Sequence, residues 1–457
     1  MTSARRTGIK EYRYFHTASA KRNRAELGRP VRTMNEFIPR MIEVRQNYPA
    51  STKLDFSSLI ERQFAQAGIS EKIKPGMTIA VGVGSRGIGN LSEIVKATID
   101  ALKNAGARPF IVPAMGSHGG ATPEGQTKVL ADYGITDRNL GVPIEARMDV
   151  RCIGTVLDGR DVLFSIPALE ADGVVAINRV KPHTDFRGPL GSGILKMLTI
   201  GFGKQAGANS AHRAVTHLGH EQVIREFSKV ILDSVQVLCA VAIVEDQRHH
   251  TAEVEVMRPD QIASAEERLL EKARGLMPRL PLDEIDLLII DEIGKEISGA
   301  GMDPNVTGRD GSGYSDSLLA ESEGTPRVFR IFVRDLSVAT NGNGIGIGMA
   351  DFTTSRAVKA LDLRYTYMNA LTSIKLLSSK IPIHFDSDRE AIQVGLATLA
   401  SANPETLRVM RIANTLSLER LLVSENCVKL LTGRPEVSIS GTAQPMRFDD
   451  HGNLPPF

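Results

Sequence analysis

The sequence predicts an α/β fold with two domains on parallel-rich sheets and an active site in the cleft between them. A short β-rich apolar run at residues 77–83 ends in glycines. An amphipathic helical pattern follows at residues 91–102, and a second β-rich run follows at residues 108–115. This order makes a βαβ unit, whose two strands pair in parallel. The 457 residues are enough for two or three domains of ordinary size.

The rest of the chain continues this alternation. Further strands are expected at residues 173–178, 235–244, 285–290 and 327–333, one long helix at residues 205–233, and another helix through residues 266–274. Pro278 and Pro281 predict a linker. We therefore expect a basic, flexible extension at 1–36, an N-terminal cofactor-binding α/β domain at 37–278, a C-terminal α/β domain at 279–430, and a tail at 431–457, for which a return to the N-terminal domain is one option.

Composition excludes several classes of protein. Hydrophobic residues make up 42% of the chain, which is ordinary for a globular protein and too high for a disordered one. No run of about 18 apolar residues and no secretory signal pattern occurs, so we expect a cytoplasmic protein without a membrane span. Cys152, Cys239 and Cys427 are odd in number and far apart, which predicts three buried thiols rather than disulfides or a thiolate metal site.

Positive charge is concentrated at the start of the chain. Residues 1–32 contain nine Lys or Arg residues and two Glu residues, although the net charge of the whole chain is only +2. Such an arm can bind nucleic acid or an anionic membrane. No interleaved aromatic residues or base-reading motif accompany it, so we expect a solvated extension and no nucleic-acid partner.

A glycine-rich loop follows the first predicted strand. Residues 82–87, Gly-Val-Gly-Ser-Arg-Gly, fit the G-x-G-x-x-G pattern, in which backbone N–H groups and a helix start bind a phosphate. The dinucleotide version of this motif needs an acidic residue after the next strand to bind a ribose. The sequence there is Met115-Gly-Ser-His, which weakens an NAD-binding interpretation. A turn that only packs the helix on the strand is the structural alternative.

Polar residues follow three of the predicted strands, and Arg86 follows the first. His118 stands in a small-residue loop after the second strand, and an imidazole is suited to proton transfer near neutral pH. His183, Asp185, Arg187 and Lys196 follow the strand at 173–178 and are separated by glycines. Lys196 lies between two apolar residues, so we expect it to have an anionic or covalent partner. Because parallel strands end at one edge of a sheet, these groups are expected to meet there.

Two further histidines raise a zinc alternative. His217 and His220 stand three residues apart on the long predicted helix, at a spacing that metal ligands use. No HExxH pattern or carboxylate at ligand spacing accompanies them, so a zinc hydrolase is not favoured.

Taken together, these fragments resemble the ordered signature of the nickel-dependent lactate racemase family. The resemblance rests on Ser85-Arg86, Gly116-Ser-His118, His183, Ser192-Gly193 with Lys196, and His212, all within about 130 residues. It covers the first two thirds of the chain. Val83, where the family has an aspartate, and Ile194, where it typically has a glycine, depart from the pattern.

The resemblance implies a racemase or epimerase of a 2-hydroxy acid that works by proton-coupled hydride transfer. The implied cofactor is a nickel-pincer nucleotide, a pyridinium-3-thioamide-5-thiocarboxylate mononucleotide linked covalently through Lys196, with His212 binding nickel. His118 and His183 would be the acid/base pair. The other implied cofactor-binding residues are Gly84, Ser85, Arg86, Gly87, Ser192 and Gly193, and the implied substrate-binding residues are Arg86, Lys295 and Arg309. Separate cofactor-biosynthesis proteins are the implied partners.

Two other functions remain open on the sequence alone. One is an NAD-dependent oxidoreductase that uses the loop Gly82 to Gly87. The other is a non-catalytic protein that carries a nucleotide or metallocofactor on Lys196 and His212 while His118 is idle.

Overall fold

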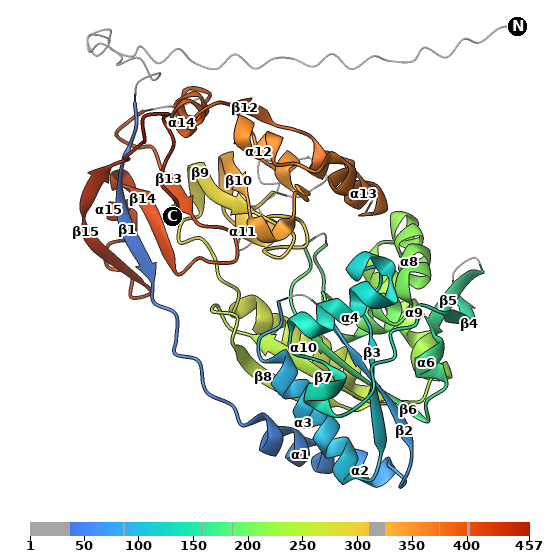
Figure 1. Cartoon of the computed structure of the whole chain (residues 1–457). Coiled ribbons are helices and arrows are strands. Elements are labelled where there is room, and N and C mark those ends of the chain that lie inside the picture. The colour runs from blue at the N-terminus through green and yellow to red at the C-terminus, as the bar shows by residue number, and fades with distance from the viewer. Residues whose placement is uncertain are drawn as a thin grey trace, which may run out of the picture.

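The fold consists of two β-sheets with helices packed against them (Figure 1). It is described here from a computed structural model, which describes residues 37–457 apart from 86, 157–158, 185, 310–324, 374 and 400–402. The basic extension at 1–36 therefore lies outside the described residues. The predicted α/β class with parallel-rich sheets is confirmed.

The smaller sheet has five strands in the order β3-β2-β6-β7-β8. Its strands are β2 (Thr78–Val83), β3 (Arg108–Pro113), β6 (Gly173–Arg179), β7 (Val237–Glu245) and β8 (Thr251–Met257). The first four strands of this order pair in parallel, and β8 pairs antiparallel with β7. The predicted strands at 77–83, 108–115, 173–178 and 235–244 are all present. A hairpin of β4 (Val150–Val156) and β5 (Arg160–Ser165) stands apart.

Helices cover both faces of the smaller sheet. Successive residues of a strand point to opposite faces, so an all-apolar strand needs a packed core on each side. Ile79 and Val81 of β2 face a core formed with α1 and α3, whereas Ala80 between them faces the core formed with α8, α9 and α10. The helices of this part are α1 (Phe56–Gln66), α2 (Ile69–Lys72), α3 (Leu91–Asn104), α4 (Pro123–Asp132), α5 (Asp137–Leu140), α6 (Ile166–Leu169), α7 (Ile194–Lys196), α8 (Lys204–Leu218), α9 (His220–Ser234) and α10 (Ile262–Gly275).

The larger sheet has eight strands in the order β12-β11-β10-β9-β13-β14-β1-β15. Its strands are β1 (Arg40–Gln46), β9 (Glu284–Ile293), β10 (Arg327–Leu336), β11 (Phe352–Thr354), β12 (Ile383–Phe385), β13 (Val409–Ile412), β14 (Arg420–Ser424) and β15 (Val437–Pro445). The half from β12 to β13 is parallel, and the remaining pairings are antiparallel. The helices of this part are α11 (Pro304–Thr307), α12 (Ser355–Lys359), α13 (Leu363–Ser373), α14 (Asp388–Ala397) and α15 (Val428–Leu431).

Several segments differ from expectation. Strand β1, expected with the N-terminal domain, pairs with β14 and β15 of the larger sheet, and β15 in the tail stays there too. These antiparallel pairings join residues almost 400 positions apart, so local pattern could not predict them. The single helix expected at 205–233 is two helices, because Gly219 has a φ of +78° that ends α8. Cys152 is exposed, and only the other two cysteines are buried.

A buried ion cluster ties the C-terminal tail to the larger sheet. Asp291 of β9 accepts two hydrogen bonds of 2.7 Å from Arg411 of β13 and pairs with Arg334 of β10. Arg334 also pairs with the wholly buried Asp388 at 2.8 Å. The two guanidinium groups donate to the carbonyl oxygens of residues 454 and 455 at 2.6 and 2.5 Å. The chain end is thereby held across the sheet.

The two sheets occupy separate halves of the molecule (Figure 1). Polar contacts between side chains and loops join the two halves. Arg248, in the turn after β7, forms an ion pair of 2.9 Å with Glu419, just before β14. Asn305 of α11 donates to the carbonyl oxygen of His183 at 3.2 Å. None of the helices in the described ranges is both long and apolar enough to cross a membrane.

Replacing Asp291 by Asn should lower the free energy of unfolding by about 3 to 5 kcal/mol. The change leaves two buried guanidinium groups short of a counter-charge, and breaking a buried ion pair on one side costs about this much. Urea denaturation followed by circular dichroism measures the effect. The control is Asp100→Asn, which breaks an exposed pair with Lys96 and should cost less than about 1 kcal/mol. Equal losses in the two variants would contradict the importance of the cluster.

Candidate active site

Three strands of the smaller sheet deliver the candidate residues to one edge. The carboxyl ends of β2, β3 and β6 lie side by side because β2 pairs in parallel with both neighbours. Ser85 follows β2, and its hydroxyl is hydrogen-bonded to Nδ1 of His118, which follows β3. The structure therefore brings these two predicted site residues together. Arg86, a predicted site residue that directly follows Ser85 in the sequence, lies outside the described residues.

The loop after β6 brings Lys196 to His183. Lys181 and Ser192 exchange backbone hydrogen bonds of 2.8 and 2.9 Å, which fold the loop back on itself. Lys196 Nζ then lies 2.5 Å from His183 Nε2 and 3.5 Å from Ser192 Oγ. A nitrogen of His183 can accept from an ammonium only while the ring is neutral. Asp185, in the same loop, lies outside the described residues.

Asn178 joins two of the glycine-containing loops and was not singled out from the sequence. It stands near the carboxyl end of β6, and its Nδ2 donates to Gly193 O at 2.9 Å. A Cβ atom at Gly84 would lie 2.3 Å from Asn178 Oδ1, so only glycine fits there. The signal was available, because Asn178 is the first polar residue after the apolar run that predicts this strand.

The side chain of Glu266 binds the backbone of α7, the short helical turn that carries Lys196. Glu266, on α10, is wholly buried, and its Oε2 accepts the backbone N–H of Leu195 at 2.9 Å. A Cβ atom at Gly193 would lie 2.2 Å from its other oxygen. Burial raises the pKa of Glu266 to about 7, although the N–H groups of Leu195 and Ile194 oppose this shift. The charged pattern of residues 266–274 predicts a solvated helix, so nothing in the sequence singles out this residue.

The glycine loop after β2 is held by protein groups on both sides of Gly87. Its carbonyl oxygen accepts from Arg179 at 2.6 Å, and its N–H donates to the hydroxyl of Tyr133. Arg179 is also paired with Glu245, which accepts the N–H of Gly89 at 2.7 Å. Burial acts to raise the pKa of Glu245, but the charge of Arg179 and these hydrogen bonds hold it below its usual range. The Gly87 N–H therefore already has a partner that a phosphate would have to displace.

His212 lies on α8, the long helix that follows the Lys196 turn. A five-residue π-helical turn at Met197–Gly201 leads from Lys196 toward this helix, and His212 is half-buried on it. Turns of this kind are often found at functional sites. His217 and His220 stand on different helices, on either side of Gly219, so they do not share a helix face as the zinc alternative requires. Among the described residues, no three His, Cys, Asp or Glu side chains form a metal-binding group.

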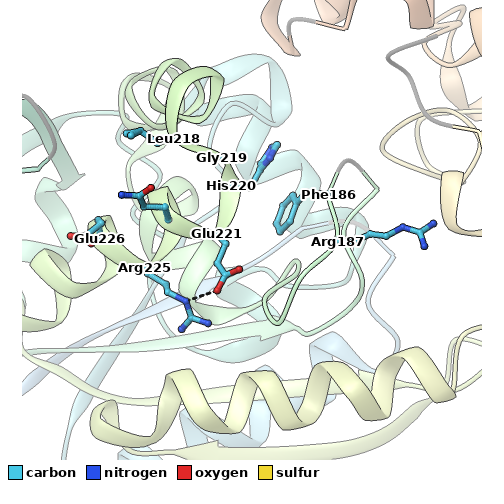
Figure 2. A pocket seen from close by; sticks show the side chains of 9 residues that line it. Phe186, Arg187, Leu218, Gly219, His220, Glu221, Arg225 and Glu226 are labelled. Carbon is cyan, nitrogen blue, oxygen red and sulfur yellow. Dashed lines mark hydrogen bonds and ion pairs between the residues drawn. The ribbon is translucent and has the colours of Figure 1, made fainter. Parts of the chain in front are cut away.

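His220 belongs instead to an aromatic stack with His183. The ring centroid of Phe186 lies 4.4 Å from that of His183 and 4.3 Å from that of His220, and the two histidine rings lie 5.6 Å apart. A cavity of about 600 Å³ opens beside Phe186 and His220 (Figure 2). Its lining includes Arg187 and Arg225, but neither His118 nor Lys196. The cavity thus borders the edge where the candidate residues meet and does not enclose them.

The two predicted substrate residues of the C-terminal part have different surroundings. Lys295 Nζ donates to Gly299 O at 2.8 Å and to Asn369 Oδ1 of α13 at 2.9 Å. The guanidinium of Arg309 is held by Asp351 at 2.8 Å and by carbonyl oxygens of the larger sheet and its loops. These contacts tie Arg309 to the larger sheet and its loops. Asn305, by contrast, contacts the His183 loop.

Comparison with known proteins supports the fold. The chain is similar in structure to the lactate racemase apoprotein from Thermoanaerobacterium thermosaccharolyticum, with a TM-score of 0.51 and 12% sequence identity. The similarity covers 83% of this chain and 99% of that chain. Searches with protein-family models and among curated proteins give no match. At this level of identity the likeness establishes a shared fold.

The variant Glu266→Gln should change how stability depends on pH. The folded pKa of about 7 lies above the ordinary value of 4.5, so the folded chain holds a proton that the unfolded chain releases between these values. The stabilisation that this group contributes in wild type is therefore fully present below about pH 4.5 and is lost as the pH rises to about 7. Glutamine cannot ionise, so the variant should gain about 1 to 3 kcal/mol relative to wild type between pH 4.5 and pH 8.

Urea denaturation of both proteins at the two pH values measures this gain. Glu61→Gln, at an exposed position of α1, is the control and should show no such gain. The prediction would be contradicted if the stability difference between Glu266→Gln and wild type were the same at pH 4.5 and at pH 8.

Proposed function

We propose that this chain is an isomerase that racemises or epimerises a 2-hydroxy acid by proton-coupled hydride transfer with a nickel-pincer nucleotide. The observation that carries the proposal is the 2.5 Å contact between Lys196 Nζ and His183 Nε2, at the sheet edge where His118 also stands. Two imidazoles and a lysine thus stand at the edge where open parallel sheets bind ligands. The structural likeness to a lactate racemase apoprotein supports the same class of reaction.

The residues present fit the proposed cofactor. Lys196 lies in a turn supported by the Glu266 carboxylate, so its amine is held in place for a covalent bond. His212 would bind nickel, and because no described group of three side chains forms a metal site, the cofactor would have to supply most of the other donors. Sulfur donors with one imidazole suit nickel. Gly84, Ser85, Ser192 and Gly193 would line the nucleotide, with Arg86 and Gly87 in the same loop.

The chain itself would hold the substrate and move a proton, while the bound nucleotide supplies a ring carbon that accepts and returns a hydride. His118 and His183 would act on the substrate hydroxyl, each for one enantiomer. Since Ser85 holds Nδ1 of His118, proton transfer by this ring falls to Nε2. Lys295 or Arg86 would bind the carboxylate and limit movement of the intermediate keto acid. Separate biosynthesis proteins would supply the cofactor, and the site would lie between the two halves.

The first test is intact mass and bound metal on protein produced together with the cofactor-making proteins. Wild type should gain the mass of the nucleotide and near-stoichiometric nickel, because Lys196 attaches the cofactor. Lys196→Ala should show neither, whereas Lys229→Ala, at an exposed position of α9, should load like wild type. Wild type without added mass or nickel would sink the proposal and favour the nicotinamide or carrier alternatives.

The second test concerns His118. His118→Gln should retain bound nickel but lose at least about a hundredfold in turnover of racemising 2-hydroxy acids, the usual scale for a general acid or base. His451→Gln, at an exposed position near the chain end, is the control and should keep full turnover. Turnover is followed by chiral chromatography across lactate, malate and longer hydroxy acids. A fully active His118→Gln would exclude this histidine from the proton transfer.

A further inference from the structure

The first residue of α8 is a lysine in the protein interior. The side chain of Lys204 is 0% exposed, and its backbone φ of +53° lies in the left-handed region that few non-glycine residues adopt. Burial lowers the pKa of Lys204 to about 8. Burying an ammonium is unfavourable unless polar groups compensate for the lost water. The contacts of this side chain therefore need a reason.

Lys204 makes two hydrogen bonds to interior oxygens. Its Nζ donates to the carbonyl oxygen of Pro113 at 2.6 Å and to Oε1 of Gln126 at 3.2 Å. Pro113 is the last residue of β3, immediately before the loop that contains His118. Gln126 lies on α4, the helix that follows the same loop, and is also 0% exposed. The lysine thus contacts the segments on both sides of the loop.

Gln126 extends the contact into the loop itself. With Oε1 accepting from Lys204, its Nε2 donates to Gly116 O at 2.9 Å and to His118 O at 3.2 Å. The loop has little regular structure to hold it, since Gly116, Gly119, Gly120 and Ala121 all have positive φ angles. The side-chain hydrogen bonds from Gln126 therefore add to the turn bonds within the loop, such as that from the Ala121 N–H to His118 O at 3.2 Å.

A purely space-filling role would not need a charge at position 204. Buried ionic groups are often no more stabilising than apolar residues of similar volume, so stability alone is a weak reason for this lysine. An ammonium does give short, strong and directional hydrogen bonds, and these polarise the next bond in a chain. Here the chain ends on the backbone of the candidate acid/base residue.

We propose that Lys204, acting through Gln126, is a positioning residue that fixes the His118 loop against the start of α8, the helix that carries His212. The same side chain would then set the relative placement of the proton-transfer histidine and the nickel-binding helix. This inference rests on the proposed function for the meaning of that placement, but the contacts can be tested without the cofactor.

The test compares Lys204→Met and Gln126→Met with wild type, all produced without the cofactor-making proteins. Hydrogen–deuterium exchange of the segment 114–122 should be at least about tenfold faster in both variants, because the loop loses its side-chain hydrogen bonds. Reaction of His118 with diethyl pyrocarbonate, read by peptide mass, should also be faster. Ile60→Ala, on α1, removes buried packing but no hydrogen bond to the loop, and it is the control for lost stability.

The double variant distinguishes positioning from a general effect on stability. If Lys204 acts through Gln126, Lys204→Met/Gln126→Met should give the same loop exchange as Gln126→Met alone. The proposal would be overturned if exchange in the segment 114–122 rises no more than in Ile60→Ala. It would also be overturned if the effects of the two single variants add in the double variant. Gln126→Met keeps the test valid if Lys204→Met does not fold.

Loaded enzyme gives a further readout. The two single variants should bind nickel and gain cofactor mass like wild type, yet lose about ten- to a hundredfold in turnover at saturating substrate, the scale expected from a small misplacement of a catalytic group. If loaded wild type is inactive, the proposed function is contradicted. The hydrogen–deuterium exchange of the loop then decides the inference about Lys204. Active wild type with fully active, normally exchanging variants would contradict this inference alone.

Discussion

The parallel pairing of β2 with both β3 and β6 is the constraint on which the candidate site depends. It forces three loops, which begin after residues 83, 113 and 179, to leave the sheet at one edge. Side-chain contacts then fix those loops to one another, with Ser85 on His118 and Asn178 between Gly84 and Gly193. The glycines are needed because the loops approach more closely than a Cβ atom permits. Sheet topology thus brings the candidate residues to one edge, and these contacts hold their loops in position.

Two buried charges of opposite sign support the two halves of this edge. Glu266 accepts the N–H of Leu195 beneath the Lys196 turn, and Lys204 donates toward the His118 loop. Both are wholly buried, and both have pKa values shifted by burial toward the neutral form. Glu266 binds the backbone beside Lys196 directly, whereas Lys204 reaches the backbone of His118 through Gln126. A backbone group held by a buried charge in a low-dielectric interior has little freedom to move. Each charge costs stability and in return restricts a segment that carries a candidate functional residue.

The sequence predicted the smaller sheet and the meeting of its loops because both depend on local pattern. Apolar runs define β2, β3 and β6, and the rule that parallel strands share an edge needs no further information. The sequence could not place β1 or β15, since their antiparallel pairing joins distant segments of similar composition. Glu266 and Lys204 were missed because a charged residue in a helical pattern is normally solvated, and only the fold shows that these two face inward. The break at Gly219 was predictable, because glycine often ends a helix.

His183 lies at one of the points where the two halves of the molecule meet. Its ring is contacted by Lys196 and stacked on Phe186 of the smaller-sheet half, and its carbonyl oxygen accepts from Asn305 of the other half. A proton-transfer group tied to both halves would sense any change in their relative placement. In this structure the Lys196 ammonium also donates to the same nitrogen, Nε2, that an acid/base role would use. Under the proposed function, covalent attachment at Lys196 removes that positive charge, so loading of the cofactor and release of His183 for catalysis would be one event.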